Sequence, residues 1–211
     1  MTSDVSGADM QEEKFIDFYF DLTSPYSYIA AELIEAIARE GGRTVNYKPT
    51  LLGFIFQSTG NTPPMANPAK GKYSVKDFDR TARFYGLPIN FPAKFPINAT
   101  AATRALLKVK DDMPEKMGEF VRALYRAYFV DGRDITDAAV VGQVAHDIGL
   151  NAEVIAGAND EPEYKQKSKL AVEESIAAGM FGAPYFVVDG EAFWGQDRME
   201  QLRKWVVEGP F

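Results

Sequence analysis

The sequence predicts an α/β fold in which two strand-bearing ends enclose a long helical section. Three observations predict it: a strand–helix–strand pattern over residues 15–48, a helical pattern over most of residues 100–179, and two short strands followed by a helix over residues 184–207. The order is therefore β-α-β, then helices, then β-β-α. This is the plan of a thioredoxin-like domain with a large all-α domain inserted between its two halves.

These patterns also place the domain boundaries. We expect residues 15–50 and 180–211 to form the thioredoxin-like domain and residues 51–179 to form the helical insertion. Residues 1–14 are polar and acidic and lack the apolar stretch of a signal peptide, so we expect a disordered leader on a cytoplasmic protein.

The first end of the chain has clear local signals. The aromatic run FIDFYF, residues 15–20, predicts a strand. Ser24 suits a helix N-cap and Pro25 the first helical turn, while Gly41 stops the helix. A second strand follows at residues 44–48, and such a crossover favours parallel strands.

The middle of the chain changes character. Residues 50–96 are rich in Pro, Gly and Asn, with a short helical piece at 74–85. Farther on, Asp134 or Thr136 can cap a helix that ends at Gly149. One apolar helical face is formed by Met117, Phe120, Val121, Leu124, Tyr125 and Tyr128.

The second end reads as a hairpin and a helix. Residues 184–189 predict a strand, the dipeptide Asp189-Gly190 predicts a tight turn, and residues 192–194 begin the partner strand. Residues 197–207 predict a terminal amphipathic helix.

Composition excludes several kinds of chemistry. The chain has no cysteine, which rules out disulfides, thiolate metal sites and disulfide oxidoreductase activity. Its net charge of −7 argues against a nucleic-acid or anionic-membrane surface, and no apolar run is long enough to span a bilayer. The single histidine, His146, lies in an amphipathic helical stretch, so a catalytic triad is disfavoured, and no cluster has metal-ligand spacing.

The most informative stretch is Ser24-Pro25-Tyr26-Ser27 at the junction of the first strand and helix. A Cys-Pro-x-Cys run here would indicate a thiol redox site, but both sulfurs are replaced by oxygens. A helix N-terminus stabilises an anion, and the Ser24 hydroxyl can donate a hydrogen bond to an external thiolate. The alternative is that Ser24 is only an N-cap in a corner without function.

Two further stretches bear on this choice. Pro184 opens a strand in the second half of the chain, where a cis proline would leave the Ala183 backbone free for an extended ligand, although an ordinary strand-start proline fits as well. Gly195, Gln196 and Asp197 precede the last helix. Their amides and carboxylate suit the head of an α-amino acid, although Asp197 also suits a helix cap.

Three separated stretches, FDLTSPYSYIA, LLGFIFQSTGNTPPMANPAKGKY and MFGAPYFVVDGEAFWGQDRME, together resemble the DsbA-like kappa-class glutathione transferase family. Within it they are most similar to the 2-hydroxychromene-2-carboxylate isomerases. The resemblance implies glutathione as the cofactor, with Ser24 hydrogen-bonded to its sulfur and the backbone at Ala183 and Pro184 pairing with its cysteinyl unit.

The resemblance also implies contacts with the two ends of glutathione. Asn61 and Lys70 match the polar pair near the ligand, and Lys70 suits a carboxylate; by composition alone they would be a turn residue and a solvated lysine. Gln196 and Asp197 would hold the γ-glutamyl head. Relatives often carry lysine where this chain has Gln57, and this difference leaves the exact substrate open.

The reaction implied is isomerisation of 2-hydroxychromene-2-carboxylate to trans-o-hydroxybenzylidenepyruvate by reversible thiolate addition. Its partners would be a small aromatic carboxylate and a second copy of the chain. Two alternatives remain: a kappa-like transferase that forms stable conjugates, and a non-catalytic thioredoxin-like binding module. Candidates for an aromatic substrate pocket, each of which could equally be core, are Tyr26, Tyr28, Phe54, Phe56, Tyr85, Phe91 and Trp194.

Overall fold

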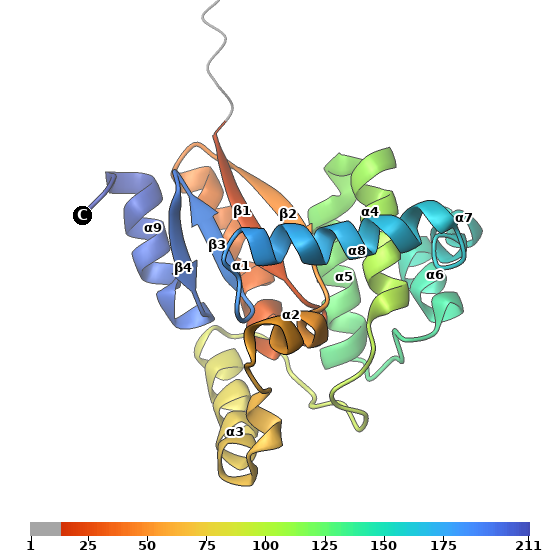
Figure 1. Ribbon diagram of the computed structural model, residues 1–211, viewed down its shortest axis with the longest axis horizontal. Coiled ribbons are helices and arrows are strands. Elements are labelled where there is room, and N and C mark those ends of the chain that lie inside the picture. Colours follow the sequence, from red (N-terminus) through yellow and green to blue (C-terminus); the bar gives the residue numbers. More distant parts are fainter. Residues whose placement is uncertain (1–13) are drawn as a thin grey trace, which may run out of the picture.

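A computed structural model describes residues 14–211 (Figure 1). Residues 1–13, almost the whole of the expected leader, lie outside the described part. The boundaries of the helical insertion stay predictions. None of the helices formed by the described residues is both long enough and apolar enough to cross a membrane.

The strands of residues 14–211 form one four-stranded sheet in the order β2-β1-β3-β4. Strand β1 (Phe15–Phe20) runs parallel to β2 (Thr44–Pro49), joined by helix α1 (Pro25–Glu40), as the β-α-β pattern predicts. Strand β3 (Tyr185–Val188) pairs antiparallel with β1 on one side and with β4 (Glu191–Trp194) on the other. The sheet thus brings the two ends of the chain together.

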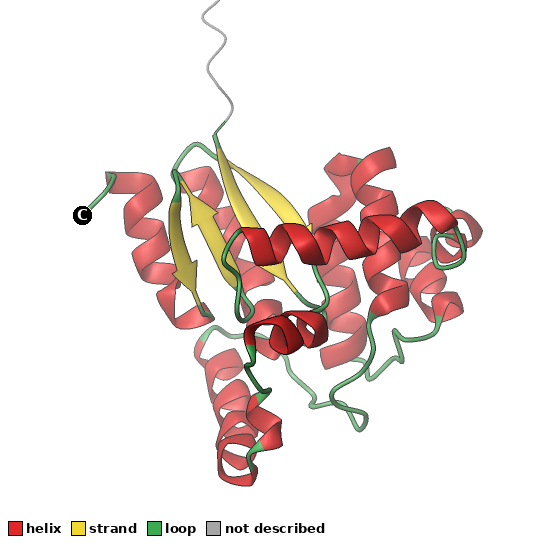
Figure 2. Ribbon diagram, viewed as in Figure 1, coloured by secondary structure: helices red, strands yellow, loops and turns green. Residues whose placement is uncertain are grey.

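Helices cover both faces of the sheet (Figure 2). Helices α1, α5 and α9 pack together on one face, and α8 lies across the other face beside α2 (Figure 1). The remaining elements, in chain order, are α2 (Leu52–Thr59), η1 (Pro64–Ala66), α3 (Pro68–Phe84), α4 (Thr100–Asp112), η2 (Pro114–Lys116), α5 (Met117–Phe129), α6 (Ala138–Asp147), α7 (Ala152–Gly157), α8 (Pro162–Ala177), η3 (Gln196–Arg198) and α9 (Met199–Glu208).

The alternation of β1 divides its side chains between two layers. Ile16, Phe18 and Phe20 are fully buried in the layer shared with α1, and Phe18 stacks on Phe186 of β3 at 5.2 Å between ring centroids. Tyr19 points to the opposite layer. The larger core continues into the helical section, where all six residues of the predicted apolar face are buried: Met117, Phe120, Val121, Leu124, Tyr125 and Tyr128.

Two helix starts differ from the sequence-based expectation. Helix α3 begins at Pro68 rather than near residue 74, because Asn67 accepts hydrogen bonds from the Ala69 and Lys70 N–H groups at 3.0 and 3.1 Å. Helix α6 is capped by Asp137, whose carboxylate accepts the Ala139 N–H. The sequence suggested Asp134 or Thr136 as the cap, and the structure places it at Asp137 instead.

A tight turn joins β3 to β4. Asp189 and Gly190 have φ values of 52° and 83°, the left-handed pair that a two-residue hairpin turn requires.

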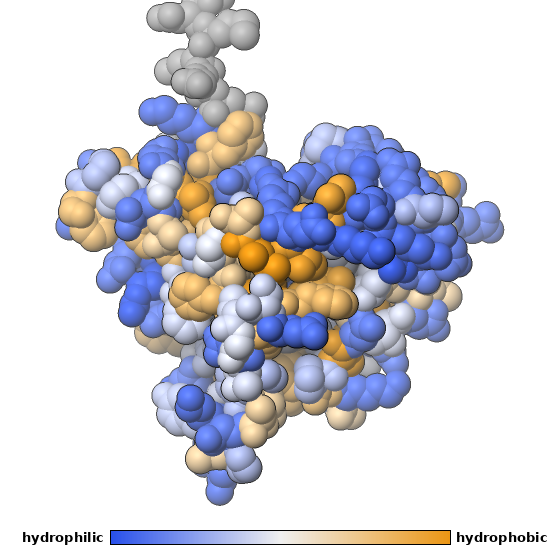
Figure 3. Space-filling view, viewed as in Figure 1, coloured by the Kyte–Doolittle hydropathy of each residue, from blue (hydrophilic) through white to orange (hydrophobic). Residues whose placement is uncertain are grey.

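In the space-filling view, apolar surface gathers around α2 and the adjoining edge of α8, while the outer face of α8 is hydrophilic (Figure 3). Phe54 of α2 is 57% exposed there.

Candidate active site

A cavity of about 750 Å³ opens where the start of α1, the loop before β3, α2 and the first turn of α3 meet. Most of its wall is apolar, and a small number of polar side chains face into it, as is usual for sites that bind small molecules. The segment before α4 also contributes to the wall, with Phe95, Ile97 and Asn98.

Ser24 lies on the wall of this cavity and also caps α1. Its side-chain oxygen accepts the Ser27 N–H at 3.2 Å, and its hydroxyl donates to the Ala183 carbonyl at 3.2 Å. Pro25 has no N–H, and the Tyr26 N–H has no intrahelical acceptor because it lies in the first turn of α1. The cap and the cavity-lining role are therefore compatible, because one hydroxyl accepts from the helix while its proton remains free to change partner.

The loop before β3 contains the expected cis proline. The Ala183–Pro184 bond is cis, Ala183 and Gly182 line the cavity, and the Pro184 carbonyl accepts the Gly195 N–H at 2.9 Å. At Gly182 a Cβ would lie 2.6 Å from the indole nitrogen of Trp194, so glycine lets the indole lie against the loop. The backbone of Ala183 thus faces the cavity beside Ser24.

Asp21 was not expected from the sequence. Its carboxylate is buried between Ser24 and α2, where it accepts the Thr23 N–H and the Leu52 N–H, both at 2.6 Å. Burial raises the pKa of the carboxyl, and the two backbone N–H groups oppose that rise. The signal that could have found it is an acidic residue that directly follows a buried apolar strand.

Asn61 and Lys70 also line this cavity. The Asn61 amide donates to the Phe181 carbonyl at 3.2 Å, which ties the turn after α2 to the loop that carries Ala183. Lys70 lies in the first turn of α3, and no carboxylate among residues 14–211 lies within ion-pair distance of its ammonium group. It is the one basic residue among the described residues that line the cavity.

Gln196 and Asp197 lie beside the start of α1, in η3, but outside the cavity wall. Gln196 is buried, whereas Asp197 is exposed and pairs with Arg198 at 3.1 Å. The negative charge of Asp197 contributes to the raised pKa of the Tyr26 phenol, behind burial and the nearby Asp77, so the carboxylate lies near the mouth of the site.

Part of the expected aromatic pocket is present. Tyr26, Phe54, Phe56 and Trp194 line the cavity, and Trp194 contacts Phe181 edge to face at 4.7 Å. Phe181 was missed by sequence reasoning, because it stands outside any regular element and next to a glycine.

Three expected pocket residues lie elsewhere. Tyr28 is fully buried in the core and its hydroxyl donates to the Pro88 carbonyl at 2.8 Å, because the position four residues after Ser24 faces α5 rather than the cavity. Tyr85 ends α3 and packs against the core. Phe91 stacks on Phe78, and it is Phe78 rather than Phe91 that lines the cavity.

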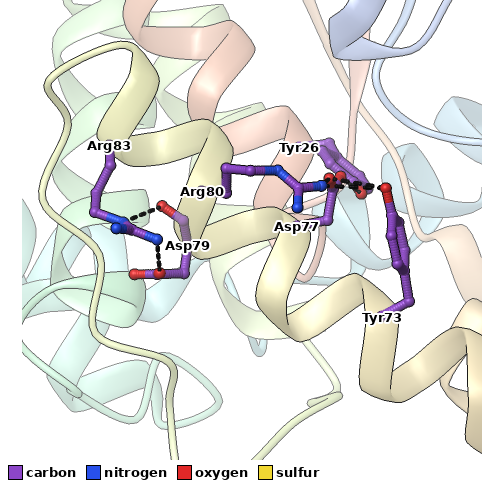
Figure 4. Close-up of polar contacts among 6 residues, drawn as sticks. All are labelled: Tyr26, Tyr73, Asp77, Asp79, Arg80 and Arg83. Atoms are coloured by element: carbon purple, nitrogen blue, oxygen red, sulfur yellow. Dashed lines mark hydrogen bonds and ion pairs between the residues drawn. The ribbon is translucent and has the colours of Figure 1, made fainter.

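The two tyrosines of the corner do not have a proton available for a ligand. The Tyr26 hydroxyl donates to Asp77 at 2.5 Å (Figure 4), and the Tyr28 hydroxyl donates to Pro88. Each phenol carries one proton, so neither residue can donate a hydrogen bond to a substrate in this arrangement.

The single histidine takes no part in this site. His146 is exposed on α6, where it contacts Gln143 at 3.4 Å, and it is not among the residues that line the cavity. Residues 14–211 contain no group of three or more His, Cys, Asp or Glu side chains placed to hold a metal ion.

The fold and the corner define a class: a thioredoxin-fold protein with serine in the position of the redox cysteine and a cis proline opposite it. The profile of the DSBA-like thioredoxin domain matches residues 15–206. A 2-hydroxychromene-2-carboxylate isomerase from Sphingobium xenophagum is 32% identical over 92% of this chain and 99% of its own length. Glutathione S-transferase kappa 1 from Homo sapiens is 29% identical over 89% of this chain and 88% of its own.

A solved structure of a 2-hydroxychromene-2-carboxylate isomerase superposes with a TM-score of 0.82 at 22% identity, covering 90% of this chain and 93% of that one. The chain therefore belongs to the DsbA-like thioredoxin family, among the kappa-class glutathione transferases and 2-hydroxychromene-2-carboxylate isomerases.

Proposed function

We propose that this protein is a glutathione-dependent isomerase of aromatic catabolism, of the 2-hydroxychromene-2-carboxylate type. The observation that carries the proposal is the position of the Ser24 hydroxyl, at the N-terminus of α1, on the wall of a large cavity and 3.2 Å from the carbonyl next to a cis proline. Relatives named as such isomerases and as kappa-class transferases support it. A cytoplasmic location, where glutathione is kept reduced, would suit this activity.

The residues around Ser24 fit an extended tripeptide thiol. A cysteinyl unit that pairs with the Ala183 backbone would donate its amide N–H to the carbonyl that Ser24 now occupies. The Ser24 proton is then free to turn to the sulfur, while its oxygen continues to accept the Ser27 N–H. On binding, the Ser24 hydroxyl would thus give up its hydrogen bond to the Ala183 carbonyl and donate a charge-assisted one to the thiolate.

The other contacts extend from this point. Lys70, without an ion-pair partner in the described chain, would hold a carboxylate of the tripeptide, and Asn61 lies nearby on the same wall. Gln196 and Asp197, next to the start of α1, would hold the γ-glutamyl head.

When bound, glutathione supplies a thiolate that adds reversibly to the conjugated alkene and turns the double bond into a rotatable single bond. The protein's part is to keep the sulfur ionised, which falls to the Ser24 hydroxyl and the amide dipoles of α1. The apolar wall, including Phe54, Phe56 and Trp194, would hold the aromatic ring and exclude water from the reacting bond.

A kappa-like transferase is the second candidate, and the charge of the cavity favours it. Lys70 is the one basic residue among the described lining residues, and Gln57 is neutral. If glutathione uses Lys70, the carboxylate of a second substrate has no cation of its own. A neutral electrophile would need no such cation, and this observation keeps the transferase as the alternative.

Product analysis tests the proposal. We expect 2-hydroxychromene-2-carboxylate to equilibrate with its ring-opened trans isomer while the glutathione concentration stays constant. Stoichiometric loss of glutathione would reject the isomerase in favour of the transferase. A melting temperature that millimolar glutathione does not raise would favour the third reading, a non-catalytic thioredoxin-like binding module.

A further inference from the structure

The part of the cavity wall that carries Lys70 projects from the rest of the protein (Figure 1). We define the α3 arm as residues 64–84, which comprise η1 and α3 (Figure 1). At one end of α3, Ala82 is fully buried in the main core. At the other end, Gly71 packs on Met65, which belongs to the arm itself, and Lys70 is exposed. The arm is thus anchored far from the residue that faces the ligand site.

Between its two ends, the α3 arm is joined to the start of α1 by a polar contact (Figure 4). The Tyr26 hydroxyl donates to the Asp77 carboxylate at 2.5 Å, across 51 positions of sequence. The Tyr26 ring also contacts Phe78 edge to face at 4.6 Å. Because Tyr26 is two residues from Ser24, this contact ties the arm directly to the start of α1.

Asp77 is held in place from its own helix. Arg80 forms an ion pair with the Asp77 carboxylate and donates to the Tyr73 hydroxyl at 3.1 Å, with its guanidinium 5.7 Å from the Tyr73 ring (Figure 4). The Asp77 side chain is 20% exposed, so its hydrogen bond with Tyr26 is partly shielded from water. Tyr26, in turn, has no proton left for a ligand, which argues for a structural rather than an acid role.

The position of Asp77 connects this contact to Lys70. The two residues are seven apart on α3, so they lie on the same face, about two helical turns from each other. Ser74 and Phe78, on that same face, are buried. A tilt of the arm about its anchored end would therefore move Lys70 farther than it moves Asp77.

We propose that Asp77 is a positioning residue that acts through Lys70: its hydrogen bond with Tyr26 fixes the α3 arm so that the Lys70 ammonium group reaches a carboxylate of glutathione bound at Ser24. This inference rests on the proposed function for its ligand. The hydrogen bond itself is a feature of the protein alone, and this allows the two to be tested separately.

The first test needs no ligand. Hydrogen–deuterium exchange over residues 64–76 is compared among wild type, Asp77→Ala and Tyr26→Phe, which removes the hydroxyl and keeps the ring. Loss of a hydrogen bond to a charged group should speed exchange in this segment about tenfold. Asp79→Ala is the matched control, because Asp79 is on the same helix, pairs with Arg83 at 2.7 Å and is exposed (Figure 4). Unchanged exchange in both variants would overturn the proposal.

The second test uses glutathione and calorimetry. Asp77→Ala should weaken binding about tenfold, and Asp77→Asn, which keeps an acceptor, should weaken it less. In a Lys70→Met background Asp77→Ala should have no further effect. The pKa of the bound thiol, followed by thiolate absorbance, should stay at the wild-type value in Asp77→Ala, since Ser24 is untouched.

Each outcome assigns a cause. If Asp77→Ala weakens binding as much in the Lys70→Met background as in wild type, Asp77 does not act through Lys70 and the proposal is wrong. If wild-type protein binds no glutathione, the proposed function fails, and the exchange data alone decide whether Asp77 holds the arm. Melting temperatures of all variants identify any that fail to fold.

Discussion

The corner around Ser24 and the wall formed by α2 and α3 face the same cavity but are held by different kinds of interaction. The corner is fixed by buried groups: Ser24 is 6% exposed and Asp21 is 3% exposed, and each makes two hydrogen bonds with nearby backbone or side-chain groups. The wall presents Phe54 and Lys70 to solvent, and α3 meets the corner through the Tyr26–Asp77 contact. Under the proposed function the difference separates two tasks: the buried corner would position the sulfur, and the more exposed wall would select the ligand.

This division agrees with what each region must do. A group that stabilises charge in a reaction acts best when it is already in place before the substrate arrives. A wall that admits and releases a bulky aromatic molecule needs exposed, less constrained elements. Four substitutions test this contrast.

The largest effect is expected in the corner, at Asp21. Asp21→Ala leaves the buried N–H groups of Thr23 and Leu52 without acceptors, so we expect the free energy of unfolding to fall by about 3 kcal/mol. Urea unfolding measures it. Asp17→Ala, in the strand that precedes Asp21 and half-buried, is the control. An equal effect at both positions would show that the corner is no more tightly held than β1.

The next effect belongs to the wall. Lys70→Met removes the one basic side chain from the described lining of the cavity, so we expect glutathione to bind about tenfold more weakly at low salt. The folding stability should stay the same because Lys70 is exposed. Calorimetry at two salt concentrations checks both the loss and its dependence on screening. Unchanged affinity would remove Lys70 from the ligand site.

A smaller effect on stability is expected at Tyr28, which lies in the core and not in the cavity wall. Tyr28→Phe deprives the Pro88 carbonyl of its donor and should lower the free energy of unfolding by about 1 kcal/mol, with glutathione binding unaffected. Burial also raises the pKa of Tyr28 to about 12, so the hydroxyl stays protonated at neutral pH. Changed affinity for glutathione in this variant would mean that Tyr28 reaches the site after all.

The smallest effect concerns the segment before α4. Lys94 pairs with Asp134 at 2.7 Å, and hydrogen bonds from Lys94 and from the Thr136 hydroxyl and N–H lower the pKa of that carboxyl to about 2. These contacts therefore contribute stability above the ordinary Asp pKa of 3.8, and the contribution is lost as the pH falls through about 2. Thermal melts should show a small deficit for Asp134→Asn at pH 7 that shrinks as the pH falls towards 2. Asp131→Asn, at an exposed position nearby, should show neither change.

The sequence predicts the local structure of the corner better than the contacts of the wall, for a physical reason. Ser24, Pro25 and the FIDFYF strand act within a few residues of each other, so cap and strand rules apply directly. The Tyr26–Asp77 contact joins residues far apart in the chain, and no local pattern predicts it.

The misplaced and missed residues follow the same rule. Tyr28 was expected in the pocket because it is adjacent to the corner in sequence, but helix geometry turns it into the core. Asp21 was missed because one of its two partners, the Leu52 N–H, is 31 positions away in the sequence, and no local pattern predicts that contact. The family resemblance, rather than local pattern, brought Asn61 and Lys70 into view, and the structure places both on the cavity wall.

The most direct test of the central claim is the ionisation of glutathione bound to the protein. Ultraviolet absorbance of the thiolate, followed against pH, gives the pKa of the bound thiol in wild type and in Ser24→Ala. We expect a pKa clearly below the ordinary thiol value of about 8.5 in wild type, and a rise of about one unit or more when the hydroxyl is removed. Equal values in the two proteins would show that Ser24 does not stabilise the thiolate, and the account of the corner would be contradicted.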